Sequence, residues 1–197
     1  MNNIQALQQV QSGGTGTQAD VIDRTLWAEE IFAAAPLVNR LFQNPLGVAG
    51  LLLDQTNNTQ AGQIPSNREL LVKAIKVFYV SETTAAIKAT AADIQGLYTQ
   101  IARTTVQLFV NNREFGQWTL QELFGACLMV AVNPAVTFTP PFLAPPRFHG
   151  IFPLNEPIKL AGLTQFFVEV THSVAPAADT IGDRLRIGLS GIETRVN

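Results

Sequence analysis

The side chains best suited to metal binding lie close together in the last third of the sequence. His172 follows Glu169 by three residues, and Asp179 and Asp183 come soon after it. Imidazole and carboxylate groups are the usual ligands of zinc and of harder cations. Alternation along a strand, however, places Glu169 and His172 on opposite faces, and the two aspartates lack the spacing of a calcium-binding loop. The pattern therefore predicts no metal site.

Catalysis needs a nucleophile with a base beside it, and the sequence places no such pair together. Ser190 lies in Gly-Leu-Ser-Gly, which differs from the G-x-S-x-G elbow. Cys127 lies in an apolar run, as a buried thiol does, and His149 is expected at the surface or in an interface. The glycine-rich run at 13–16 has no lysine and no strand before it, so it is no phosphate loop. We expect no catalytic residue and no cofactor, and a small hydrolase remains an alternative.

Aromatic side chains offer a different binding chemistry. Phe109, Phe115 and Trp118 flank a predicted hairpin, and such rings stack on sugars. Rings at these positions more often pack on each other across the hairpin. The alternative hypothesis is therefore a carbohydrate-binding β-sandwich module that uses Trp118, Phe115 or Tyr79.

Strand patterns must position all these side chains. Gln165–Thr171 and Arg184–Ile192 alternate between apolar and polar residues, which is typical of half-buried strands. Leu70–Val80 is apolar on both faces, which predicts a central strand covered on both sides. Thr104–Val110 and Arg113–Trp118 are separated by two asparagines, which tolerate the positive φ of a tight turn. The sequence therefore predicts a mainly β, antiparallel sandwich.

Helical patterns are expected beside the strands. Asp20–Phe42 has acidic residues in its first half and an apolar stripe that includes Trp27 and Ile31. Thr90–Ala102 has apolar residues at i, i+3, i+4 and i+7. Thr119–Phe124 begins with the spacing of a capping box and is expected to form one helical turn.

These patterns divide the chain into three parts. Residues 1–18 are glutamine- and glycine-rich and predict a flexible N-terminal arm. Residues 19–67 are expected to form a helical extension with a loop, and residues 68–197 the β-sandwich.

Charge is sparse in this chain. Charged residues make up 14% of the 197 residues, where about 25% is usual, and the formal net charge is −2. Such a chain covers its surface with uncharged polar residues or buries that surface against partners. The absence of a basic run argues against direct nucleic-acid binding. The longest apolar run, Leu46–Leu53, is far shorter than the roughly 20 residues of a transmembrane helix, and no signal peptide is recognisable at the start.

Apolar side chains in three segments are candidates for subunit contacts. They lie in the N-terminal arm, in the first predicted helix and in a proline-flanked stretch before residue 153. The candidates are Ile4, Leu7, Val10, Trp27, Ile31, Phe142, Phe148 and Phe152.

Three stretches resemble bacteriophage virion proteins with a jelly-roll β-sandwich: TTVQLFVNNREFGQWTL, FHGIFPLNEPIKLAGLTQFFVEVTHS and RLRIGLSGIETRV. In such proteins a hairpin with a tight polar turn precedes a proline-rich connection. A PI-x-L segment then leads to a strand with an F-x-V-E-like pattern, and the closing strand carries L-x-G-x-x-x-R. These segments are here Pro157–Leu160, Phe166–Glu169 and Leu189–Arg195. The N-terminal stretch is similar to arms that reach between capsid subunits.

The resemblance implies a jelly-roll-like antiparallel β-sandwich, here with an N-terminal helical extension and one inserted helix. It also implies a self-assembling capsid subunit, major or minor, without catalysis. Its partners would be copies of itself and other virion proteins, and it would be made in the host cytoplasm and end in the virion. A decoration or collar protein of a tailed phage is one alternative. A carbohydrate-binding module of a phage fibre or cell-surface protein is the other.

Overall fold

The computed structural model of the protein describes residues 19–35, 37–48, 51–52, 55–80, 99–125, 147–176 and 180–196. Within these ranges the chain is mainly β. The strands are β1 (Ala19–Ile31), β2 (Val38–Leu41), β3 (Arg68–Val80), β4 (Thr104–Val110), β5 (Arg113–Thr119), β6 (Arg147–Leu160), β7 (Phe166–His172) and β8 (Arg184–Val196). A short helix, α3 (Leu120–Phe124), follows β5.

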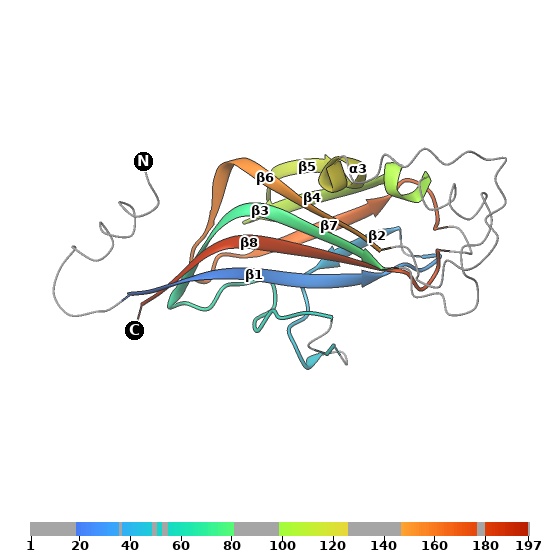
Figure 1. Cartoon of the computed structure of the whole chain (residues 1–197). Coiled ribbons are helices and arrows are strands. Elements are labelled where there is room, and N and C mark those ends of the chain that lie inside the picture. The colour runs from blue at the N-terminus through green and yellow to red at the C-terminus, as the bar shows by residue number, and fades with distance from the viewer. Residues whose placement is uncertain are drawn as a thin grey trace.

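The strands form two antiparallel sheets of four, with the orders β1-β8-β3-β6 and β2-β7-β4-β5 (Figure 1). Four of the pairings are β1 with β8, β2 with β7, β3 with β6, and β4 with β5. The chain therefore follows the course of one long hairpin whose tip is the β4–β5 turn. Pairing of β3 with β8 and of β4 with β7 completes the two sheets. The predicted mainly β, antiparallel fold is confirmed.

The helix expected over Asp20–Phe42 is wrong, because these residues form β1 and β2. Even-numbered side chains from Leu26 to Glu30 point inward, while Trp27 and Ile31 point outward. The predicted apolar stripe has a spacing of four residues, which keeps side chains on one face of a helix and on one face of a strand alike. Pairing along the whole of β1 with β8 decides between the two. This segment is thus part of the sandwich and not a helical extension.

Other local predictions are confirmed. The β4–β5 turn has Asn111 and Asn112 at φ angles of 50° and 60°. Thr119 and Glu122 form the reciprocal capping box of α3. Of the helix predicted over Thr90–Ala102, residues 99–102 are helical, and the rest lies outside the described residues.

Strand β3 is central in its sheet, as predicted, but among the described residues only one of its faces is covered. A β-bulge between Val72 and Ala74 reverses the alternation, so that inward side chains have even numbers before it and odd numbers after it. The buried apolar side chains are Leu70, Val72, Ile75, Val77 and Tyr79. On the opposite face Leu71 and Phe78 are both exposed.

The two sheets enclose one hydrophobic core but differ in length. Strands β1, β3, β6 and β8 have 13 or 14 residues, whereas β2, β4, β5 and β7 have 4 to 7. At about 3.4 Å per residue, 13 residues span roughly 44 Å and 7 residues roughly 24 Å. The inner face of the long-stranded sheet therefore extends beyond the short-stranded sheet.

The outer edge of β1 is partly covered by the connection between β2 and β3. Asn57 accepts a hydrogen bond from the Trp27 backbone N–H through Oδ1 and donates from Nδ2 to the Thr25 carbonyl. Thr56 donates to the Trp27 carbonyl. These bonds satisfy backbone groups that an edge strand otherwise exposes.

Candidate functional site

A buried polar cluster lies at the end of the sandwich where β1 ends and β8 begins. His172, the last residue of β7, has its Nε2 2.8 Å from Oε1 of Glu30 in β1, and both side chains are buried. The other ring nitrogen, Nδ1, lies 2.9 Å from Gln100 Nε2 and 2.9 Å from Thr104 Oγ1. Asn39 Nδ2 donates to the same Glu30 oxygen at 2.6 Å. The strand ends of both sheets thus meet in one hydrogen-bonded network.

The Glu30 carboxylate sets the role of one nitrogen of the His172 ring. A carboxylate oxygen accepts, so Nε2 carries the proton that points at Glu30. The Thr104 hydroxyl donates its own proton to the Gln100 carbonyl at 2.7 Å. Both nitrogens of the ring are therefore engaged, and neither is left to bind a metal or to act as a base.

Aromatic rings pack around this cluster. Phe32 meets the His172 ring edge-on, with 4.9 Å between centroids and 74° between planes. Tyr79 lies 5.7 Å from Phe32 and donates its hydroxyl proton to the buried carboxylate of Asp183. These rings enclose the cluster, so it is a structural network. We call this end of the sandwich, where β1 ends and β8 begins, the closed end.

The structure does not bring together the candidate metal ligands that it describes. Glu169 faces away from the core and pairs with Arg40 at 2.9 Å, so the predicted opposite parity of Glu169 and His172 is confirmed. Asp183 binds Tyr79, and Asp179 lies outside the described residues. Among the residues that the structure describes, no group of three or more histidine, cysteine or acidic side chains is arranged to hold a metal ion.

The remaining candidates for catalysis are dispersed. Ser190 accepts a hydrogen bond from the Thr25 hydroxyl at 3.0 Å on the outer face of the long-stranded sheet. His149 is exposed on β6, as predicted for a surface residue. Cys127 lies outside the described residues.

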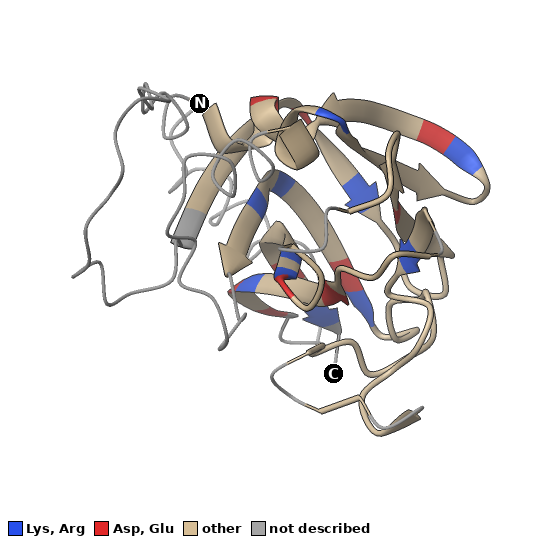
Figure 2. Cartoon of the chain, turned by 90° about the vertical axis from the view of Figure 1, so that its right-hand side faces the viewer, with Lys and Arg blue, Asp and Glu red and all other residues tan. Residues whose placement is uncertain are grey.

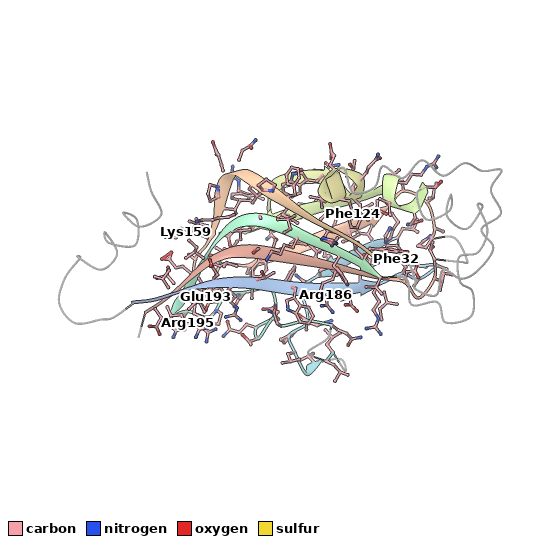
Figure 3. All side chains as sticks on the ribbon, in the orientation of Figure 1. Phe32, Phe124, Lys159, Arg186, Glu193 and Arg195 are labelled. Atoms are coloured by element: carbon pink, nitrogen blue, oxygen red, sulfur yellow. The ribbon has the colours of Figure 1, made fainter. Side chains whose placement is uncertain are left out.

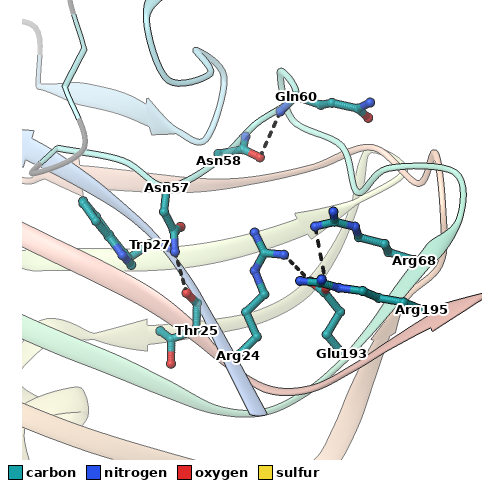
Figure 4. Close-up of polar contacts among 9 residues, drawn as sticks. All are labelled: Arg24, Thr25, Trp27, Asn57, Asn58, Gln60, Arg68, Glu193 and Arg195. Atoms are coloured by element: carbon teal, nitrogen blue, oxygen red, sulfur yellow. Dashed lines mark hydrogen bonds and ion pairs between the residues drawn. The ribbon is translucent and has the colours of Figure 1, made fainter. Parts of the chain in front are cut away.

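A second charged cluster surrounds Glu193 at the opposite end of the β1–β8 pair. Arg24 Nη1 lies 2.6 Å from Glu193 Oε2, and Arg195 Nε lies 2.5 Å from Oε1. Arg68 Nη1 lies 3.6 Å from the same Oε1. Figure 4 shows the three arginines converging on this carboxylate from β1, β3 and β8. We call Arg24, Arg68, Glu193 and Arg195 the Glu193 cluster.

The different strand lengths explain why charged side chains lie on the core-facing side of the long-stranded sheet at this end. Arg24 shares the inward parity of Leu26, and Glu193 that of Leu189, so both belong to the core-facing side of their sheet. Figure 3 places Glu193 and Arg195 at one end of the ribbon and Phe32 at the other. Because the inner face overhangs the shorter sheet, the arginines keep contact with water while Glu193 is only 1% exposed.

A third cluster lies on the outer face of the same strands. Glu29 Oε1 lies 3.2 Å from Arg184 Nη1, and Glu29 Oε2 lies 2.9 Å from Arg186 Nη2. The Arg186 guanidinium also stacks on Trp27, 4.3 Å from the ring centroid. Trp27, a predicted subunit contact, is therefore half-buried beneath an arginine. Figure 2 shows charged residues of both signs scattered over the strands, with most of the ribbon uncharged.

The other predicted subunit contacts have mixed outcomes. Ile31 is exposed on β1, while Phe152 on β6 is half-buried and faces Trp118 with 6.2 Å between centroids. The side chain of Phe148 is not among those described. Ile4, Leu7, Val10 and Phe142 lie outside the described residues, as does the whole predicted arm over 1–18.

The predicted sugar-binding rings do not form a platform. Tyr79 is fully buried, so its proposed role in stacking on a sugar is wrong. Phe109 stacks on Phe167 across the strands at 4.8 Å, and Trp118 lies over Gly116, where an added Cβ would be 2.5 Å from the indole. Phe115 is the exposed ring among them. Phe109 thus packs across strands on β7, and the expected packing across the β4–β5 hairpin is not seen for it.

Sequence reasoning missed both ionic clusters. Glu193 and Arg24 are separated by 169 positions, so no local spacing brings them together. A weak signal was present in β8, where Glu193 falls on the face that Leu185, Ile187 and Leu189 share. Such a residue needs partners, because an unpaired buried charge is very unfavourable.

Comparisons with known proteins give no family for this chain. No protein-family model matches it, and no curated protein is significantly similar to it. Within the described ranges, none of the helices has the length and apolar character needed to cross a bilayer.

Proposed function

We propose that the protein is a virion structural subunit, a jelly roll that associates with copies of itself through the sides of the sandwich and catalyses no reaction. The observation that carries this proposal is the strand order. The pairs β1–β8, β2–β7, β3–β6 and β4–β5 follow one long hairpin folded over into two sheets, and this supports a jelly roll, the arrangement of many capsid and lectin domains.

The surface supports self-association over ligand binding. Large apolar side chains are exposed on several elements, with Ile151 and Leu52 each 64% exposed. Only 14% of the residues are charged, so few charges have to be desolvated when two copies meet.

Strand β6 is the edge that we expect to contact a neighbour. It is an edge strand of 14 residues and carries Ile151 on its outer face. Pro153 and Pro157 remove two backbone donors, which disfavours the addition of a further strand. Contact through side chains is therefore favoured, and repetition of such contacts by symmetry stabilises a shell.

The test is the molar mass in solution, measured by light scattering over a concentration series, for the natural chain and for Ile151→Asp. We expect a closed oligomer or larger assembly that dissociates at about tenfold higher concentration in the variant, because a charge replaces a buried apolar contact. Asn112→Asp is the matched control, since it adds the same charge at an exposed position in the β4–β5 turn, outside β6. A monomer at every concentration would reject the proposal and favour a binding module.

A further inference from the structure

The Glu193 cluster has more positive charge than its carboxylate neutralises. Three guanidinium groups surround one carboxylate, which leaves a formal local charge of +2. Asp20 lies opposite Arg195 in the strand register and is exposed, and counting it still leaves +1. A second anion is therefore attracted to this place, although the whole chain carries −2.

The cluster also has more hydrogen-bond donors than acceptors. Each guanidinium carries five N–H groups, whereas one carboxylate has about four acceptor positions. The Nε of Arg68 is buried and has no hydrogen-bond partner among the described residues. A buried donor without an acceptor destabilises the fold, so the cluster is short of acceptors.

Solvent access differs between the carboxylate and the arginines. Glu193 is 1% exposed, whereas the side chains of Arg24, Arg68 and Arg195 are 18%, 27% and 34% exposed. The inner carboxylate thus holds the guanidinium groups together, and their outer sides face water. Preorganised arginines of this kind suit the oxygens of a phosphate, which accept paired N–H bonds.

We infer that the Glu193 cluster is a binding site for a phosphate group. The group is either free inorganic phosphate or a phosphodiester of a nucleic-acid strand, which present the same oxygens to the arginines. The inference is independent of the proposed self-assembly, because it depends on four side chains within one chain.

The test measures binding of inorganic phosphate by calorimetry at constant ionic strength, for the natural chain and two variants. Arg195→Gln removes the most exposed guanidinium while Arg24 still holds Glu193, and we expect affinity to fall at least about tenfold. Arg186→Gln is the matched control, because it removes an arginine that pairs with Glu29 on the outer face of the sheet, and affinity should be unchanged. Circular dichroism verifies that each variant is folded.

A second arm distinguishes the two sources of phosphate. Fluorescence anisotropy with a labelled oligothymidylate reports binding of a phosphodiester strand. Binding that inorganic phosphate displaces and that Arg195→Gln weakens identifies the strand as the ligand, whereas phosphate binding without oligonucleotide binding identifies the free ion. No binding of either probe, or equal loss in Arg195→Gln and Arg186→Gln, would overturn the inference.

Discussion

Each end of the β1–β8 pair contains a buried carboxylate, but the two carboxylates have different partners. Glu30 lies between the two sheets and is bound by an imidazole and an amide. Glu193 lies where the long-stranded sheet overhangs the other and is bound by three arginines. Between the sheets the partners of Glu30 are the short side chains His172 and Asn39. At the overhang the long arginine side chains extend from Glu193 to water. Burial of the carboxylate alone therefore does not tell a structural cluster from a binding site; the exposure of its partners does.

The largest expected loss of stability is at the closed end, where His172 binds Glu30. His172→Leu removes the proton donor to Glu30 and leaves a buried carboxylate with Asn39 as its remaining described partner. We expect the free energy of unfolding in urea to fall by about 3–5 kcal/mol.

The control for this variant is His149→Leu, which changes an exposed histidine on β6 and should alter stability by less than about 0.5 kcal/mol. The double variant Glu30→Leu/His172→Leu should recover part of the loss, because no carboxylate is then left unpaired. Equal stability of His172→Leu and the natural chain would contradict a structural role for this pair.

A smaller loss of stability is expected at the opposite end of the sandwich, at the Glu193 cluster. Glu193→Gln leaves three arginines without their carboxylate, but these arginines can turn toward water. We expect a loss of about 1–2 kcal/mol in phosphate-free buffer, again from urea unfolding. Glu69→Gln is its control, because Glu69 pairs with the exposed Lys159, and a surface pair contributes about 0–1 kcal/mol. A loss as large as that of His172→Leu would remove the distinction between the two ends.

The smallest effect concerns Glu122, a carboxylate outside both clusters. The backbone N–H and then the hydroxyl of Thr119 donate to it, and they hold its pKa below the ordinary value. A lowered pKa in the folded state stabilises α3 above the unfolded pKa, and this contribution is lost as pH falls through the lowered folded value. NMR titration of the Glu122 carboxyl should show the pKa rising toward its ordinary value in Thr119→Ala. An unchanged titration would contradict the capping box.

Local structure could be predicted from the sequence wherever a residue pattern fits only one conformation. The alternation in β7, the asparagine turn after β4 and the capping box at Thr119 each correspond to one conformation. Strand β1 was misread because its apolar spacing suits helix and strand equally. The Glu193 cluster was beyond sequence reasoning, because β1, β3 and β8 each contribute to it and only the sheet order makes them neighbours.

The pairing of β1 with β8 also has a consequence for biosynthesis. Arg24 and Glu193 are 169 positions apart, so β1 leaves the ribosome long before its partner strand exists. Until then the long-stranded sheet lacks β8, the strand that joins β1 to β3. Contacts between such distant residues form slowly, and unpaired strands tend to aggregate while they wait. The newly made chain is thus most vulnerable to misassembly during its own synthesis, and a chaperone that shields β1 would raise the yield of folded protein.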